Sequence, residues 1–206
     1  VKKILSANNL VFYCWAENGW RSFGTKEIPI RKPEDLQGLK MRAMQSDHHV
    51  AMYKALKAKP VPLNLPDVVK ALKKGDVVGF DQSPLYLTAA SWQKHIKYFT
   101  LTRHIFQPAL VVFNKKLFNK LPRDLQAVIL KFAADVERYG RKRIRAIYEP
   151  LIQLVQGSGV KVIRLTPAQR VPFVIATKQA HMRVYKRQTP HARRLLNIIY
   201  KAKQGK

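Results

Sequence analysis

The sequence predicts an α/β fold, and three observations carry that prediction. Short apolar runs rich in β-branched and aromatic residues, such as residues 10–16, predict buried strands. Apolar residues at helical spacing predict amphipathic helices, the longest of them after Leu121-Pro122. Strands and helices alternate along the chain, which is typical of the α/β class.

The first half of the chain predicts strands separated by turns and short helices. The strand over 10–16 ends at turn residues, Glu17 to Gly19. Asp47 is suited to cap a helix, while Pro66 and Gly75 bracket a second one. The further expected elements are strands over 40–44, 60–63 and 77–80 and a short helix over 84–91.

The second half predicts strands over 98–102 and 109–113 and then one long helix from Leu121-Pro122. We expect Gly140 to weaken this helix and Pro150 to kink it. A strand follows over 160–165. Thr166 caps a further helix, and another helical segment follows Pro190.

Chain length and net charge limit the classes of function that the sequence can have. The chain has 206 residues, enough for one domain or two small lobes, and 47% are hydrophobic, enough for a core. Lys and Arg number 39 and Asp and Glu 12, giving a net charge of +27. From Arg141 onward there are sixteen bases and one acid, Glu149. Such a charge attracts anions: nucleic acid, anionic lipid, acidic partners or small acids.

Several classes are excluded or disfavoured. A single cysteine, Cys14, rules out a disulfide framework and a Cys-based zinc site, and it is read as an inert core thiol. No apolar run reaches the length of a membrane helix. Nucleic-acid motifs and catalytic motifs are absent, so we expect neither nucleic-acid binding nor an enzyme. The adjacent His48 and His49 are a poor metal pair, and no metal or cofactor is expected.

Two arginines beside predicted strands are the candidate binding residues. Arg21 follows a strand and a turn, and Arg42 lies inside the strand between Met41 and Ala43. A guanidinium there either lines a cleft as a bidentate clamp on a carboxylate, or lies on an edge strand and reaches to water. The remaining basic residues are read as solvated helix faces.

An ordered series of segments resembles the solute-binding proteins of TRAP (tripartite ATP-independent periplasmic) transporters. The match is strong from about residue 10 to 138. The segments are Glu17 to Arg21 (ENGWR), Pro33 to Arg42 (PEDLQGLKMR), Met52 to Leu63 (MYKALKAKPVPL), Val69 to Gly79 (VKALKKGDVVG), Lys97 to His104 (KYFTLTRH) and Lys120 to Gln126 (KLPRDLQ).

The resemblance implies a periplasmic-binding-protein-like, two-lobed α/β fold with long C-terminal helices, which binds an organic acid in an interlobe cleft. In this family the arginine at the position of Arg42 pairs with the ligand carboxylate, and the one at Arg21 supports the anion. Gln45 and Ser46 are then expected beside the ligand. Leu65 stands where the family has an aromatic residue, and Gln82 where it has an asparagine.

The resemblance also implies that most of the first lobe is missing from this chain. Residues 1–107 would form the second lobe, with the ligand arginines, and residues 108–206 the return segment to the first lobe, with long basic helices. The implied function is a periplasmic solute-binding protein that works with the membrane subunits of a TRAP transporter. The alternative is a degenerate relative that traps no ligand and docks in a larger assembly, through basic surfaces, against acidic partners.

Overall fold

A computed structural model describes residues 1–187 and 189–203. The described chain divides into two compact units, each built from three separate stretches. Unit 1 comprises Val1–Ser22, Gln82–Lys94 and Arg103–Val162. Unit 2 comprises Phe23–Asp81, His95–Thr102 and Ile163–Lys206.

The strands form a six-stranded sheet with the order β3-β2-β4-β1-β5-β6, in which β2 is parallel to both of its neighbours. β2 and β3 belong wholly to unit 2. Every predicted strand is present, which confirms the α/β class. The strands are β1 (Leu10–Thr25), β2 (Lys40–Ala43), β3 (Lys59–Pro62), β4 (Gly79–Gln82), β5 (Tyr98–Asn114) and β6 (Lys161–Arg164).

β1 and β5 are the two long strands, and their residues 10–22 and 103–114 form a ribbon in unit 1. They run antiparallel, because Lys97 N donates to Thr25 O (3.0 Å) at one end and Lys115 N donates to Asn9 O (2.9 Å) at the other. Each of these two strands contributes to both units: residues 23–25 of β1 and 98–102 of β5 belong to unit 2.

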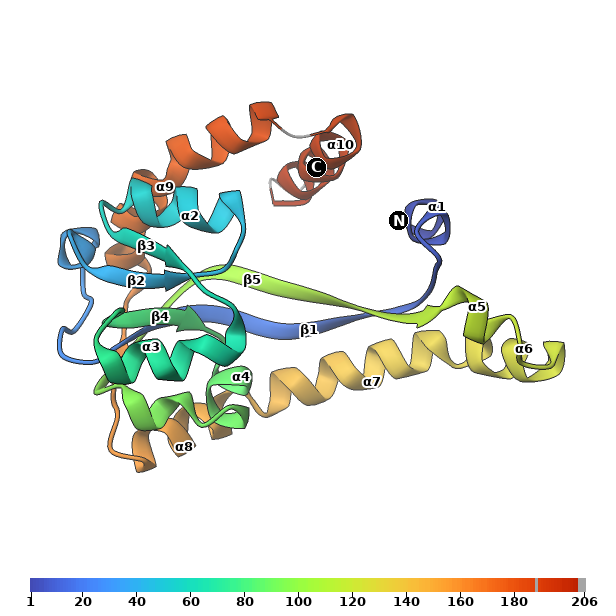
Figure 1. The fold of residues 1–206 in the computed structure, drawn as a ribbon, viewed down its shortest axis with the longest axis horizontal. Coiled ribbons are helices and arrows are strands. Elements are labelled where there is room, and N and C mark those ends of the chain that lie inside the picture. Colours follow the sequence, from blue (N-terminus) through green and yellow to red (C-terminus); the bar gives the residue numbers. More distant parts are fainter. Residues whose placement is uncertain (188, 204–206) are drawn as a thin grey trace. The chain divides into compact units, whose positions relative to one another are not determined.

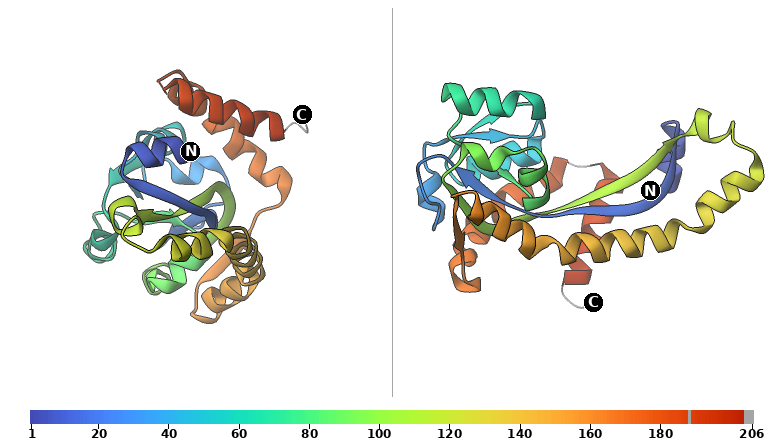
Figure 2. Two further views of the ribbon diagram at one scale, coloured as in Figure 1. Left: turned by 90° about the vertical axis from the view of Figure 1, so that its right-hand side faces the viewer. Right: turned by 90° about the horizontal axis from the view of Figure 1, so that it is seen from below.

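Helices cover both faces of the sheet in unit 2. α2 packs against α9 on one face, and α3 lies on the other (Figures 1 and 2). Met41, Tyr53 and Phe80 are among the side chains that this arrangement buries completely. The helical elements are η1 (Pro33–Leu36), α2 (Asp47–Ala55), η2 (Leu65–Asp67), α3 (Val68–Lys74), α9 (Pro167–Arg187) and α10 (Pro190–Lys203); the turn η3 (Trp92–His95) joins the units.

Unit 1 combines its ribbon with helices. α7 runs beside the ribbon, where Glu137 accepts a hydrogen bond from Trp15 N (3.1 Å), and α8 packs against α4 (Figure 1). The helices are α1 (Lys2–Ala7), α4 (Pro84–Ala89), α5 (Lys115–Phe118), α6 (Arg123–Lys131), α7 (Ala133–Ala146) and α8 (Tyr148–Gly157).

Two predicted strand ends were wrong, because residues with positive φ lie inside strands. The predicted turn over Glu17 to Gly19 is part of β1: Gly19 takes φ of +81°, which bends the strand without ending it. Similarly, the strands predicted over 98–102 and 109–113 are one strand, β5, with Arg103 at φ of +48°. A glycine or polar run in sequence does not distinguish a turn from a bulge.

The predicted long helix is instead three helices. The breaks fall at Phe132 and Ile147, whereas Gly140 lies inside α7. Pro150 is the third residue of α8. It has no N–H to donate to the carbonyl of Ala146, so the helical ladder is interrupted just before it. In place of the expected kink at Pro150, the chain has a break between α7 and α8 at Ile147.

The helix ends follow the sequence signals closely. Gly75 ends α3 in the left-handed conformation, and Thr166 and Gln169 exchange the two hydrogen bonds of a capping box (2.9 and 3.2 Å). Asp47 was predicted as an N-cap; Ser46 takes that position and Asp47 is the first helical residue. Helix α1 was not predicted.

Cys14 is expected to resist thiol reagents in the native protein. Only 2% of the residue is exposed, and burial, together with the charge of Glu137, raises the pKa of the Cys14 thiol. The thiolate is thus disfavoured at pH 8, so labelling by Ellman's reagent should follow unfolding. Rapid stoichiometric labelling of native protein would contradict this placement.

Candidate functional site

Arg42 is buried in an interior strand of unit 2, with 2% of its surface exposed. Because β2 lies between β3 and β4, the alternative of an edge strand with its arginine reaching to water is wrong. Arg42 Nε and Nη2 both donate to Leu63 O, at 3.1 and 2.8 Å. This forked bond to the backbone just after β3 holds the guanidinium plane in one orientation.

The turn after β2 carries the next predicted residues. Gln45 is exposed and Ser46 half-buried, and Ser46 N donates to Met44 O (2.8 Å) to close the turn before α2. Leu65, the first residue of η2, follows β3 and is 40% exposed. In unit 2 the structure therefore places Arg42, Gln45, Ser46 and Leu65 on or directly after the neighbouring strands β2 and β3.

Arg21 is the centre of a second group, in unit 1. It is 1% exposed, and its Nη1 donates to Gln82 Oε1 (3.0 Å) and to Gln107 Oε1 (2.9 Å). Gln82 Oε1 also accepts from Ser83 N (3.0 Å). The amide oxygen of Gln82 is thus engaged, and its NH2 group is the end suited to meet an acceptor.

Of the six predicted site residues, the structure joins Arg21 and Gln82 by a hydrogen bond; the other four belong to unit 2. Sequence reasoning missed two supporting groups, Gln107 and the Leu63 carbonyl. Gln107 could have been noticed as a polar residue in the run from Ile105 to Phe113. A backbone carbonyl leaves no signal in a sequence.

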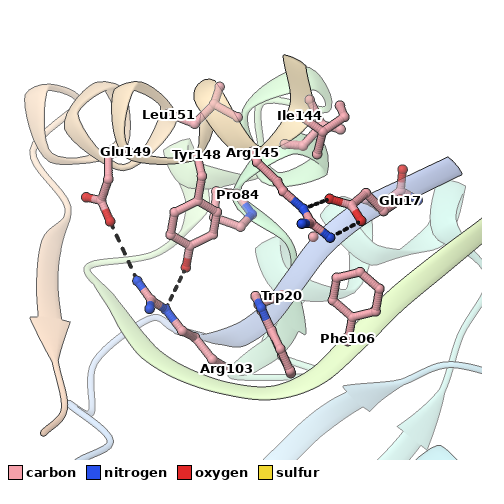
Figure 3. A pocket seen from close by; sticks show the side chains of 13 residues that line it. Glu17, Trp20, Pro84, Arg103, Phe106, Ile144, Arg145, Tyr148, Glu149 and Leu151 are labelled. Atoms are coloured by element: carbon pink, nitrogen blue, oxygen red, sulfur yellow. Dashed lines mark hydrogen bonds and ion pairs between the residues drawn. The ribbon is translucent and has the colours of Figure 1, made fainter. Parts of the chain in front are cut away.

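Unit 1 also contains a pocket of about 530 Å3, which none of the predicted site residues lines (Figure 3). Trp20 and Phe106 meet edge to face on one wall, with ring centroids 5.2 Å apart. The other lining residues are Glu17, Asn18, Gly19, Pro84, Leu85, Arg103, Ile144, Arg145, Tyr148, Glu149 and Leu151.

Each arginine of this pocket already faces a carboxylate (Figure 3). Arg145 makes a bidentate pair with Glu17 (2.8 and 3.1 Å), and the hydrogen bond and charge of Glu17 raise the pKa of Arg145. Arg103 donates to Tyr148 Oη (3.2 Å) and lies 3.6 Å from Glu149. Two arginines and two glutamates balance in charge, so this pocket is less suited to an anion than the surroundings of Arg42.

Within the described chain, no cluster of three or more His, Cys, Asp or Glu side chains could hold a metal ion. Of the helices described, none has the length and apolarity needed to cross a membrane.

Comparison with known proteins gives a consistent set of matches. Residues 1–188 match the family of bacterial extracellular solute-binding proteins, family 7. A solute-binding protein of Verminephrobacter eiseniae is 39% identical over 64% of this chain and 38% of its own length. The 2,3-diketo-L-gulonate-binding periplasmic protein YiaO of Escherichia coli is 27% identical over 97% of this chain and 60% of its own.

Solved structures agree with the sequence comparison. A TRAP periplasmic solute-binding protein from Sulfitobacter, solved with bound β-D-galacturonate, superimposes with a TM-score of 0.86 at 25% identity, over 95% of this chain and 64% of that one. A TRAP periplasmic solute-binding protein from Sulfurospirillum deleyianum, solved with bound succinate, gives 0.82 at 25% identity, over 90% and 61%. The chain thus spans less than two thirds of the length of these relatives.

Proposed function

The chain belongs to the bacterial extracellular solute-binding proteins of family 7, the TRAP-type family, and from this premise we propose that it binds an organic acid through the acid's carboxylate. The relatives solved with β-D-galacturonate and succinate carry acids of this class. Members of the family are binding proteins rather than enzymes, and the proposal contains no chemical step.

The observation that carries the proposal is the burial of Arg42. A guanidinium removed from water is costly unless charge or hydrogen bonds compensate it. The forked bond from Nε and Nη2 to Leu63 O fixes the plane of this side chain. An oriented guanidinium suits the planar, bidentate recognition of a carboxylate better than a flexible ammonium would.

The other site residues have supporting roles in this proposal. The side chains of Gln45 and Ser46 would donate hydrogen bonds to the acid, and Leu65 would offer it apolar surface where relatives use an aromatic ring. Arg21 would stabilise the anion electrostatically, with the Gln82 amide oriented beside it.

Arg42→Ala should weaken binding of succinate or D-galacturonate by about 30-fold or more, because removing one partner of a buried charge pair costs at least about 2 kcal/mol. Calorimetry on the full gene product that contains this chain measures the affinity. Arg123→Ala, at an exposed arginine at the start of α6, is the matched control and should bind as wild type does. Arg42→Lys keeps the charge but not the forked hydrogen-bond geometry, so its affinity should lie between those of wild type and Arg42→Ala.

Undiminished affinity in a folded Arg42→Ala protein would overturn the proposal. If no organic acid shifts the melting temperature of wild type, and the protein instead elutes with a larger assembly, the degenerate structural role replaces it. Near-ultraviolet circular dichroism shows whether each variant is folded.

We also propose the location and the partners that the family implies. Family members are periplasmic or extracytoplasmic binding proteins, and the relatives matched here are TRAP-type. In this proposal the whole protein acts outside the cytoplasm and delivers its acid to the membrane subunits of a TRAP transporter.

The predicted lobes, residues 1–107 and 108–206, remain part of the proposal, together with a first lobe completed by polypeptide outside this chain. An apolar stripe in unit 1 supports the proposal that further polypeptide completes the first lobe. Among the described residues of α6 and α7 none is buried, although both helices are amphipathic. A segment of the size that relatives have in addition would cover this stripe. Its exposed members are Leu125, Val128, Phe132, Val136 and Tyr139.

A further inference from the structure

A buried polar cluster joins helix α2 to strand β4 and to the turn after β2. Met44 N donates to His49 Nδ1 (2.8 Å), and His49 Nε2 lies 2.9 Å from Asp81 Oδ1. Tyr53 Oη, one helical turn beyond His49, donates to the same carboxylate oxygen (3.0 Å). His49 is 2% exposed, and Asp81 and Tyr53 are fully buried.

The geometry assigns the proton of the imidazole. Because Nδ1 of His49 accepts the Met44 N–H, it carries no proton, so the proton of the neutral ring is on Nε2, the nitrogen that lies 2.9 Å from Asp81 Oδ1. The Asp81 carboxylate therefore selects the one tautomer that can accept from Met44. Tyr53 in turn holds Asp81 in place.

Met44 is the link between this cluster and the candidate site. It follows Arg42 and Ala43 at the end of β2, and its carbonyl accepts from Ser46 N (2.8 Å) in the turn that also contains Gln45. The hydrogen bond from Met44 N to His49 therefore restrains the backbone between Arg42 and the two predicted ligand residues of the turn.

We propose that His49 is a positioning residue of the ligand site: its imidazole, oriented by Asp81 and Tyr53, fixes the turn over Met44, Gln45 and Ser46. This rests on the proposed function of that turn in binding an organic acid. His49 does not contact the ligand. It acts through the hydrogen bond that Met44 N donates to its Nδ1.

Two substitutions of His49 test the contacts of its two ring nitrogens separately. His49→Asn places an amide oxygen near the position of Nδ1, so it can accept from Met44 but cannot reach Asp81. His49→Gln reaches Asp81 but presents no acceptor to Met44. His48→Gln, at the exposed neighbour of His49, is the matched control for the chemical change.

Hydrogen exchange at the Met44 amide should quicken about tenfold in His49→Gln and change little in His49→Asn, because only the former loses the bond. Affinity for succinate or D-galacturonate, measured on the full gene product, should fall about tenfold in His49→Gln alone. A purely structural role would lower the thermal stability of both variants without this difference in affinity.

Equal exchange rates and equal affinities in His49→Asn and His49→Gln would overturn the inference. Arg42→Ala, measured in parallel, separates it from the proposed function. If Arg42→Ala loses the acid and His49→Gln keeps it, only the positioning role fails. If Arg42→Ala retains the acid, the proposed function fails, while the exchange rate of Met44 still tests whether His49 fixes the turn.

Discussion

Gly79→Ala is expected to destabilise the protein by about 3 kcal/mol, at the upper end of the cost of overpacking a core. An added Cβ at Gly79 would lie 2.6 Å from Gly24 O and 2.9 Å from both Met41 Cε and Thr25 Cγ2. The Met41 methyl can move aside, but the Gly24 carbonyl belongs to the backbone of the adjacent strand β1. Relief would therefore require β4 to shift within the sheet.

Gly140→Ala is the matched control. Gly140 lies in the middle of α7, and nothing is within 4 Å of the Cβ that alanine would add. Alanine there should stabilise the helix by about 0.5–1 kcal/mol, because glycine loses more backbone entropy on folding. Chemical denaturation of the full gene product measures both changes. A Gly79→Ala protein as stable as wild type would mean that β4 and β1 do not pack as closely as the structure has them.

Gly79 also illustrates what could be predicted from the sequence. The strand over residues 77–80 follows from its apolar run, and the helix before it from Pro66 and Gly75. That Gly79 is a close approach of two strands does not follow, because the clash depends on Gly24, which is distant in sequence. Local signals predict elements, whereas their packing depends on pairs that no local pattern identifies.

The candidate site likewise contains one residue that a local pattern indicates and one that no local pattern indicates. The sequence indicates Arg42 because a guanidinium between Met41 and Ala43 contradicts the apolar pattern of a buried strand, and the structure buries this side chain. His49 is half of a poor metal pair in the sequence, and no local pattern indicates its bond to Met44. That bond depends on the helix returning over β2, which is a property of the tertiary structure.

The net charge says less about the proposed binding site than the individual arginines do. The net charge of +27 suggested a polyanion as partner, but the two arginines proposed to meet a ligand are among the most buried residues. Arg193 and Arg194 are exposed on α10, as expected of a solvated face. In the proposed function, binding by Arg42 and Arg21 would depend on burial and fixed hydrogen bonds, and these are independent of how many cations the surface carries.

Arg21→Ala is expected to destabilise the protein by about 3–4 kcal/mol. The substitution removes the Nη1 donor that Gln82 and Gln107 share, so one buried and one half-buried hydrogen bond are lost, together worth about 1–3 kcal/mol. It also leaves a cavity, since Arg21 is among the largest fully buried side chains. Arg123→Ala, at an exposed arginine, should change stability by less than about 0.5 kcal/mol.

A double-mutant cycle tests whether the loss comes from the hydrogen bonds rather than from the cavity. Combining Arg21→Ala with Gln107→Ala should show a coupling free energy of about 1–3 kcal/mol, because the second substitution removes an acceptor that the first has already deprived of its donor. Additive losses would contradict the arrangement around Arg21. If the two substitutions are coupled and Gln107→Ala still binds the acid, Gln107 supports Arg21 structurally. The interaction with the anion would then come from Arg21 and not from Gln107.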